Sequence, residues 1–364
     1  MLTPRQRVIS ALSGQPTDRL VWAPIIDDYY LSYLASAGRP MDAVSCLKSV
    51  GADVIARHAP FCRWRFTGGV EKRDVTANGT IRTEITTPVG SLAQTARVID
   101  GSFTVLEFLI KSREDIKIYQ YVEEHKAVEP DYEAFAKADA AVGDAGTATV
   151  SAPATPLATI FENFTGLSNF VYFLADYPDE MNALMALMHE NHKKENRVAA
   201  QSPSPAVFIY EDTSTTTISK ELYRKYCKDQ IDDYADIVHG EGKPFFVHMC
   251  GKLKGFADVI APGKMDGLDS VCPPETGDVQ PWDAPGLFGG KLIIGGIDPS
   301  RLCLASPPEI GELARETILR VKDGGKVILC TGDATAAGTP MGNLRLVAEL
   351  VNKYGRRENG IKNT

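Results

Sequence analysis

The stretch KPFFVHMCGKLKGFADVIAPGKMDGLDSV, residues 243–271, places a helical segment between two short apolar runs. The runs, 244–251 and 265–271, are apolar throughout rather than alternating. This pattern is typical of strands that are buried on both faces of a parallel sheet. A strand, a helix and a second strand in this order are the repeating unit of α/β proteins. The stretch therefore predicts an α/β fold.

The same alternation continues on both sides of this stretch. Further apolar runs lie at 147–153, 206–212, 291–299 and 326–333, and helical patterns at 219–240, 307–325 and 341–355 follow three of them. Alternation of this length predicts either a doubly wound sheet or a (β/α)8 barrel. Polar residues follow several different strands, which favours the barrel, whereas a doubly wound sheet gathers them at one switch point. No G-x-G-x-x-G motif opens a helix, which weakens a nucleotide-binding interpretation.

The first 145 residues are less regular than the rest. A helix is predicted at 4–14, and β-rich sequence at 66–106 contains an Asn78-Gly79 hairpin signal. We expect one (β/α)8 TIM-barrel domain over residues 1–364, with an N-terminal helical extension. The segment 66–106 is predicted to be a β-hairpin insertion near the barrel mouth, within the same domain.

Composition limits the partners and the compartment. The 364 residues carry a formal net charge of −8, which argues against broad binding to nucleic acid or to anionic membranes. Neither a secretory signal nor a long apolar span is evident, and the seven cysteines form no paired motif. We therefore expect a cytoplasmic protein whose functional cysteines are metal ligands or nucleophiles rather than halves of disulfides.

Several predicted strands end in residues that can bind a metal ion. His248 and Cys250 are two residues apart at one strand end, and Cys330 lies near the end of another. One imidazole and two thiolates suit zinc, and three protein ligands with a fourth position open are typical of catalytic zinc sites. Cys272 or Glu275 is a candidate additional ligand. The alternative is that these cysteines are ordinary buried core residues.

Two adjacent carboxylates, Glu211 and Asp212, follow the run at 206–212. An unpaired carboxylate is costly inside a barrel, so we expect both side chains to face the mouth as catalytic residues. Orientation of His248 and capping of a loop are the alternatives.

Four sequence motifs resemble those of one family. The HMCGK motif at 248–252, the LCTGDATAAGTPMGNLRLV motif from residue 329, the N-terminal TPRQRVISALSGQPTDRL and the central YEDTSTTTISKELYRKY are similar to those of uroporphyrinogen decarboxylase-like methyltransferases. The resemblance implies a (β/α)8 barrel, zinc held by His248, Cys250 and Cys330, and corrinoid (cobalamin) carried by a partner protein. True decarboxylases carry an arginine-rich R-Q-A-G-R stretch after the first strand. Here that place reads APIIDDYYLS, so decarboxylation of a polycarboxylate is disfavoured.

The resemblance leaves the substrate open. We expect a zinc-dependent methyltransferase that moves a methyl group from a small methylated substrate, such as an aryl methyl ether, to the cobalt of a corrinoid protein. The alternative is methylation of a coenzyme M-like or homocysteine-like thiol by the methylated corrinoid. A decarboxylase-type lyase and a barrel that binds a metal or tetrapyrrole without turnover are less favoured. A homodimer is an open alternative for the assembly.

Overall fold

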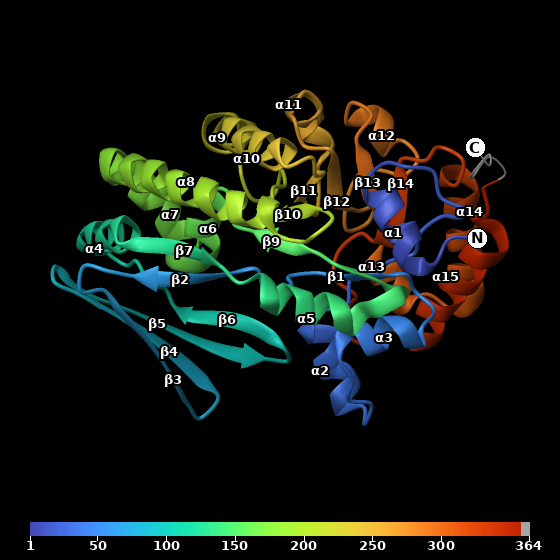
Figure 1. The fold of residues 1–364 in the computed structure, drawn as a ribbon, viewed down its shortest axis with the longest axis horizontal. Helices are drawn as coiled ribbons and strands as arrows, with labels where there is room; N and C mark the ends of the chain where they lie inside the picture. The colour runs from blue at the N-terminus through green and yellow to red at the C-terminus, as the bar shows by residue number, and fades with distance from the viewer. Residues whose placement is uncertain (358–364) are drawn as a thin grey trace.

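The structure is a computed structural model that describes residues 1–357. Its six central strands are β9 Val150–Ala152, β10 Val207–Tyr210, β11 Phe245–His248, β12 Gly267–Val271, β13 Leu292–Ile297 and β14 Val327–Thr331. They form a parallel sheet in the order β14-β13-β12-β11-β10-β9 (Figure 1). Strands β12, β13 and β14 are buried along their whole length, as expected when helices cover a parallel sheet. The α/β fold and the five strands predicted between residues 206 and 333 are confirmed.

Short hydrogen-bonded segments extend this order at both edges. β1 Val54–Ala56 pairs in parallel with β8 Gly146–Ala148, and Thr149 alone separates β8 from β9. At the other edge, the Ala23 N–H donates to the carbonyl of Leu329 in β14 over 2.9 Å. Trp22 in turn accepts a 2.8 Å hydrogen bond from the N–H of Asp53. This arrangement is consistent with the predicted barrel.

Helices follow the strands and cover the sheet (Figure 1). From residue 156 onward they are α6 Pro156–Thr159, α7 Gly166–Asp176, α8 Pro178–Gln201, α9 Lys220–Tyr226, α10 Lys228–Gly240, α11 Ala257–Ile260, α12 Ala284–Leu287, α13 Pro299–Leu304, α14 Pro307–Val321 and α15 Met341–Tyr354. The helix predicted at 219–240 begins at the expected cap, since Ser219 accepts from the Leu222 N–H, but Cys227 divides it into α9 and α10. Within residues 1–357, no helix is both long and apolar enough to cross a membrane.

The N-terminal helix closes one end of the sheet. The helices before residue 145 are α1 Pro4–Leu12, α2 Asp28–Ser36, α3 Ala43–Ser49, α4 Arg113–Glu124 and α5 Tyr132–Val142. Val8 and Leu12 of α1 belong to the same buried cluster as Phe208, Phe246 and Ile294 of the central strands. Except for Cys330, which lies inside β14, the metal-binding candidates lie at or beyond the carboxyl ends of the strands. These ends are here called the mouth, where active sites of this kind of fold lie.

The segment predicted as an insertion, 66–106, contains an antiparallel sheet. Its strands are β3 Glu71–Ala77, β4 Thr80–Thr87, β5 Gly90–Ile99 and β6 Ser102–Glu107, in that order, while β2 Cys62–Phe66 pairs with β7 Lys126–Pro130. The Asn78-Gly79 turn joins β3 to β4 with positive φ at both residues, as the hairpin signal predicts. Figure 1 shows this sheet projecting from the central layer, with one end of β6 directed towards α2.

Candidate metal centre

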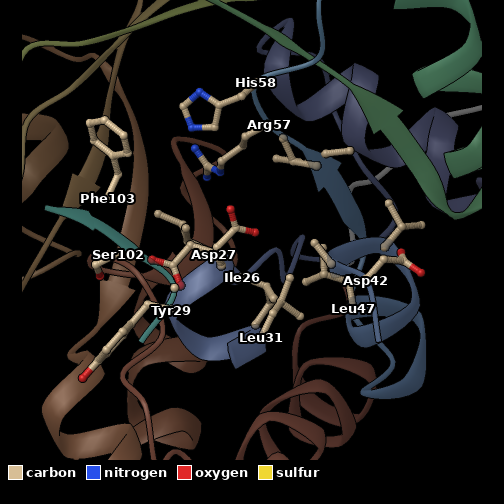
Figure 2. Close-up of a pocket in the computed structure, with 17 residues that line it drawn as sticks. Ile26, Asp27, Tyr29, Leu31, Asp42, Leu47, Arg57, His58, Ser102 and Phe103 are labelled. Carbon is tan, nitrogen blue, oxygen red and sulfur yellow. The ribbon is translucent and has the colours of Figure 1, made fainter. Parts of the chain in front are cut away.

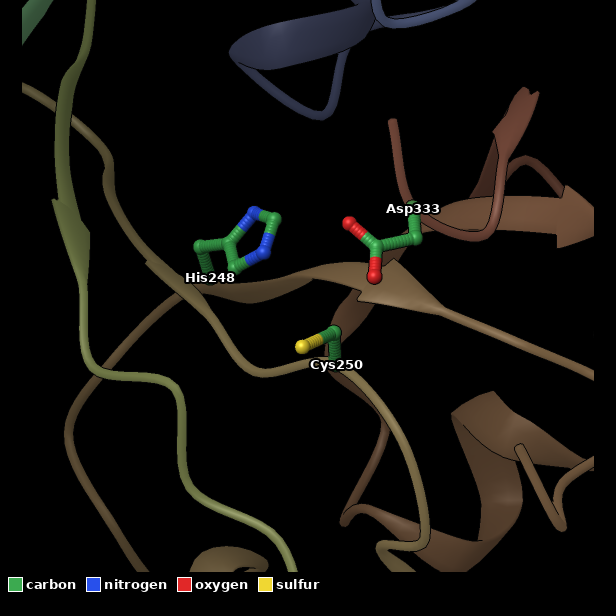
Figure 3. A group of neighbouring side chains, drawn as sticks. All are labelled: His248, Cys250 and Asp333. Carbon is green, nitrogen blue, oxygen red and sulfur yellow. The ribbon is translucent and has the colours of Figure 1, made fainter. Parts of the chain in front are cut away.

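Three potential metal ligands meet at the mouth. His248 ends β11, Cys250 follows it by two residues, and Asp333 lies two residues beyond the end of β14. Their ligand atoms all lie within 4.8 Å of one another, and Figure 3 shows the three side chains pointing towards one another. Imidazole, thiolate and carboxylate are all zinc ligands. The arrangement can therefore hold one metal ion by three protein ligands.

A buried ion pair fixes the orientation of His248. Its Nδ1 lies 2.9 Å from Oδ2 of Asp269, which is also 2.6 Å from Nη1 of Arg57. Burial opposes ionisation of Asp269, but the charge of Arg57 and the contact with His248 outweigh it and hold the pKa of that carboxyl below its ordinary value. An ionised Asp269 accepts the Nδ1–H of the imidazole, so the lone pair on Nε2 is free for a metal.

The Cys250 thiol lies among negative charges. Its Sγ–H donates to Oδ1 of Asp212 over 2.7 Å. Burial raises the pKa of the thiol, and the carboxylates of Asp333 and Asp212 raise it further. A bound divalent cation reverses this balance, because a coordinating thiol loses its proton. The site is therefore built for a cation rather than for a free thiolate.

One aromatic ring, that of Tyr210 in β10, packs against the imidazole. Tyr210 stacks on His248 with 4.5 Å between the ring centroids, and His58 lies 4.4 Å from Tyr210 with its ring tilted by 36°. Burial, followed by the charge of Arg57, lowers the pKa of His58 to about 4, so that imidazole is neutral at neutral pH. The stack restricts rotation of His248 without adding charge.

The structure does not bring Cys330 into this group. Cys330 is fully buried among inward-facing strand residues, and its Sγ lies 3.9 Å from Nη2 of Arg57. Burial raises the pKa of its thiol to about 12. The reason is its place in the chain: Cys330 is still inside β14, whereas Asp333 lies beyond the strand end and reaches the mouth.

The two candidate additional ligands also lie outside the group. Cys272 is buried, and its thiol donates to Asp298 over 3.5 Å. Glu275 is exposed. Neither belongs to the group formed by His248, Cys250 and Asp333.

The adjacent carboxylates Glu211 and Asp212 have different environments. Glu211 is buried and accepts from the Thr155 hydroxyl over 2.6 Å and from its N–H over 2.9 Å. Burial raises the pKa of Glu211 to about 7. Asp212, at φ 46°, instead contacts Cys250. Glu211 is therefore satisfied by donors inside the fold, whereas Asp212 contacts the metal-binding group; the catalytic roles of both residues stay predictions.

A cavity of about 780 Å³ opens beside the metal-binding group. Figure 2 shows Arg57 and His58 on one side of it, with Asp27 and the apolar Ile26 and Leu31 below them. From the sequence, Asp269 and Asp333 were only two of the polar residues near predicted strand ends, and Arg57 and His58 had no assigned role. Asp333 ends the predicted run 326–333 and Asp269 lies inside the run 265–271, and nearness to a strand end was the available signal for these two residues.

Comparisons with known proteins agree with this architecture. A sequence profile described as Uroporphyrinogen decarboxylase (URO-D) matches residues 79–354. A methyltransferase from Methanosarcina mazei shares the fold, with a TM-score of 0.63 and 14% sequence identity over 97% of this chain and 99% of that chain. A putative vitamin-B12-independent methionine synthase from Listeria monocytogenes reaches a TM-score of only 0.39, at 12% identity over 93% of this chain and 98% of that chain. No curated protein sequence matches. The profile covers well over half of this chain, so the chain belongs to the uroporphyrinogen decarboxylase family.

Proposed function

We propose that this protein is a zinc-dependent methyltransferase built on a (β/α)8 barrel. It moves a methyl group between a small methylated substrate and the cobalt of a corrinoid protein. The observation that carries the proposal is the convergence of His248, Cys250 and Asp333 at the mouth. Family membership and the fold shared with the Methanosarcina methyltransferase support it.

The donor set fits zinc. One nitrogen, one sulfur and one oxygen donor leave a fourth tetrahedral position open, which is the catalytic rather than the structural pattern. Sequence reasoning had Cys330 as the third protein ligand, and the geometry supports Asp333 in its place. A bound zinc ion would supply a Lewis acid for an ether oxygen or a cation that stabilises a substrate thiolate.

The residues of the chain itself prepare the site. Asp269 holds the proton of His248 on Nδ1, and Asp212 can accept the proton that Cys250 releases. The turn between β5 and β6 lies over one side of the cavity, where Gly101, Ser102 and Phe103 line it. We propose that the corrinoid partner covers the remaining opening and excludes water.

The direction of transfer is proposed to be demethylation of an aryl methyl ether. Tyr29, Leu31 and Phe103 give the cavity the apolar and aromatic lining that such a ring requires. Methylation of a thiol is the second candidate, favoured by the thiol-activating chemistry of the donor set. A decarboxylase acting on a polycarboxylate fits poorly, because Asp27 and Asp28 line the cavity and would repel it.

Formation of methylcobalamin tests the proposal. The zinc-loaded protein is mixed with cobalt(I) cobalamin and methoxylated aromatic compounds, and the absorbance of methylcobalamin is followed; the reverse assay uses methylcobalamin and thiols. We expect Asp333→Ala to lose zinc and activity and Cys330→Ser to keep both. A protein that is inactive in both directions would be a non-catalytic metal binder. If Cys330→Ser loses zinc and activity and Asp333→Ala keeps both, Cys330 and not Asp333 is the third ligand.

A further inference from the structure

The cavity beside the metal-binding group has the size and lining of a small-molecule site. It measures about 780 Å³, within the usual range for ligand pockets. Its apolar and aromatic walls come from the loop before α2, from α2 and α3 and from the β5–β6 turn, and they include Ile26, Leu31, Val44, Leu47, Tyr29 and Phe103. A flat ring would be surrounded by apolar surface on several sides.

Two chains of contacts connect this cavity to the metal-binding group. Arg57 lines the cavity and also binds Asp269, the residue that orients His248. His58 lines the cavity and its ring contacts that of Tyr210 at a tilt, and Tyr210 stacks on His248. The cavity is therefore linked to His248 through Asp269 and through Tyr210.

The charges facing the cavity are carboxylates. Asp27 is half-buried, its Oδ1 caps α2 by accepting from the Tyr30 N–H, and burial followed by the charges of Asp28 and Asp333 raises its pKa. Asp28 and Asp42 also line the cavity. The one guanidinium in the wall, Arg57, is paired with Asp269. A ligand with a hydrogen-bond donor complements this surface, whereas an anion meets like charge.

We propose that this cavity binds the methylated substrate as an uncharged methoxylated ring, that Asp27 accepts a hydrogen bond from a hydroxyl group on that ring, and that carboxylated rings are rejected. This inference rests on the proposed function, because it names the substrate class of the same site. Asp27 thereby becomes a specificity-determining residue. Figure 2 shows its carboxylate directed into the space below Arg57.

A matched pair of ligands tests the inference. Calorimetric titration of the full chain compares 2-methoxyphenol with 4-hydroxy-3-methoxybenzoate, which adds only a carboxylate. We expect the neutral ring to bind at least about tenfold more tightly, since like charges brought together at a binding site are costly. Methoxybenzene, which lacks the hydroxyl group, should bind more weakly than 2-methoxyphenol. Equal or tighter binding of the carboxylated ring, or no binding of 2-methoxyphenol, would overturn the inference.

The variant Asp27→Asn isolates the responsible carboxylate. Asparagine is as good an N-cap as aspartate, so α2 should still begin at residue 28. We expect the discrimination between the two rings to fall severalfold, while Asp229→Asn, at an exposed position on α10, leaves it unchanged. Discrimination that survives Asp27→Asn would remove Asp27 from the proposal.

Binding and turnover separate this inference from the proposed function. The titrations need no cobalt and no methyl transfer. Tight binding of the neutral ring without methylcobalamin formation would contradict the methyltransferase and leave the cavity assignment standing. Efficient demethylation of the carboxylated ring would support the methyltransferase and contradict the cavity assignment.

Discussion

Two regions of the mouth hold carboxylates in opposite ways. In the buried floor, which consists of Arg57, Asp269 and His248, the carboxylate of Asp269 is inaccessible to solvent and lies 2.6 Å and 2.9 Å from its two partners. In the cavity wall, which consists of Asp27, Asp28 and Asp42, the carboxylates border open space. The two regions therefore serve two tasks. A charge with fixed buried partners sets the orientation of a metal-binding side chain, whereas a charge beside a cavity can contact a small molecule that enters it.

Removal of the central carboxylate should have the largest effect. In Asp269→Ala the guanidinium of Arg57, almost wholly buried, loses its ion-pair partner. Breaking a buried pair from one side costs about 3–5 kcal/mol, because an uncompensated charge remains inside. Denaturant unfolding of the metal-free protein measures the loss.

An exposed pair provides the control for this prediction. Asp258 contacts Lys220 and Arg224 at the surface. Exposed ion pairs contribute about 0–1 kcal/mol, so Asp258→Ala should unfold almost like the unchanged protein. Equal losses of stability in Asp269→Ala and Asp258→Ala would mean that burial does not strengthen the contribution of the Arg57–Asp269 pair.

Glu211 is a third case, a buried carboxylate satisfied by neutral donors instead of a cation. Burial raises its pKa from 4.5 to about 7. Between these values the folded protein holds a proton that the unfolded chain has released, so the contribution of Glu211 to stability falls as the pH rises from about 4.5 to 7. A shift of this size corresponds to about 3 kcal/mol.

The variant Glu211→Gln measures that contribution. The free energy of unfolding of the metal-free variant, relative to the unchanged protein, should rise across the same pH window. Glu221→Gln should not show the trend, because Glu221 is exposed and local hydrogen bonds lower its pKa. If the difference in unfolding free energy between Glu211→Gln and the unchanged protein stays constant with pH, Glu211 is already ionised at pH 4.5.

The sequence predicted the strands, whereas several contacts around the site depend on residues far apart in the chain. Continuous apolar runs such as 244–251 identify buried parallel strands, and the H-x-C pair at the end of β11 was recognised from spacing alone. The choice between Cys330 and Asp333 depends on where β14 ends, and boundaries are the weakest part of sequence reasoning. The pairing of Arg57 with Asp269 joins residues 212 positions apart, which no local pattern reveals.

A milder change in the buried floor tests its role in orienting the metal-binding side chain of His248. Asp269→Asn keeps the shape of the side chain but removes the charge, and its amide can donate to Nδ1 of His248. That contact would favour the tautomer with a proton on Nε2, the nitrogen needed for the metal. Loss of such a partner lowers metal affinity about 10–100-fold. Competition with a zinc-binding dye measures the affinity, and Asp258→Asn should leave it unchanged.

The smallest effect is expected where the β5–β6 turn closes the cavity wall. Gly101 has φ 83°, and a Cβ added there would collide with the backbone carbonyl oxygen of Asp28. Gly101→Ala should therefore shift the turn away from α2 and weaken binding of 2-methoxyphenol severalfold. Gly79→Ala is the matched control, because Gly79 has φ 72° in a similar turn but no neighbouring atom within 4 Å of the added Cβ. Both variants carry the same kind of backbone strain, so only the loss of the contact with α2 should separate their affinities. Equal binding by the two variants would show that the turn does not close the cavity.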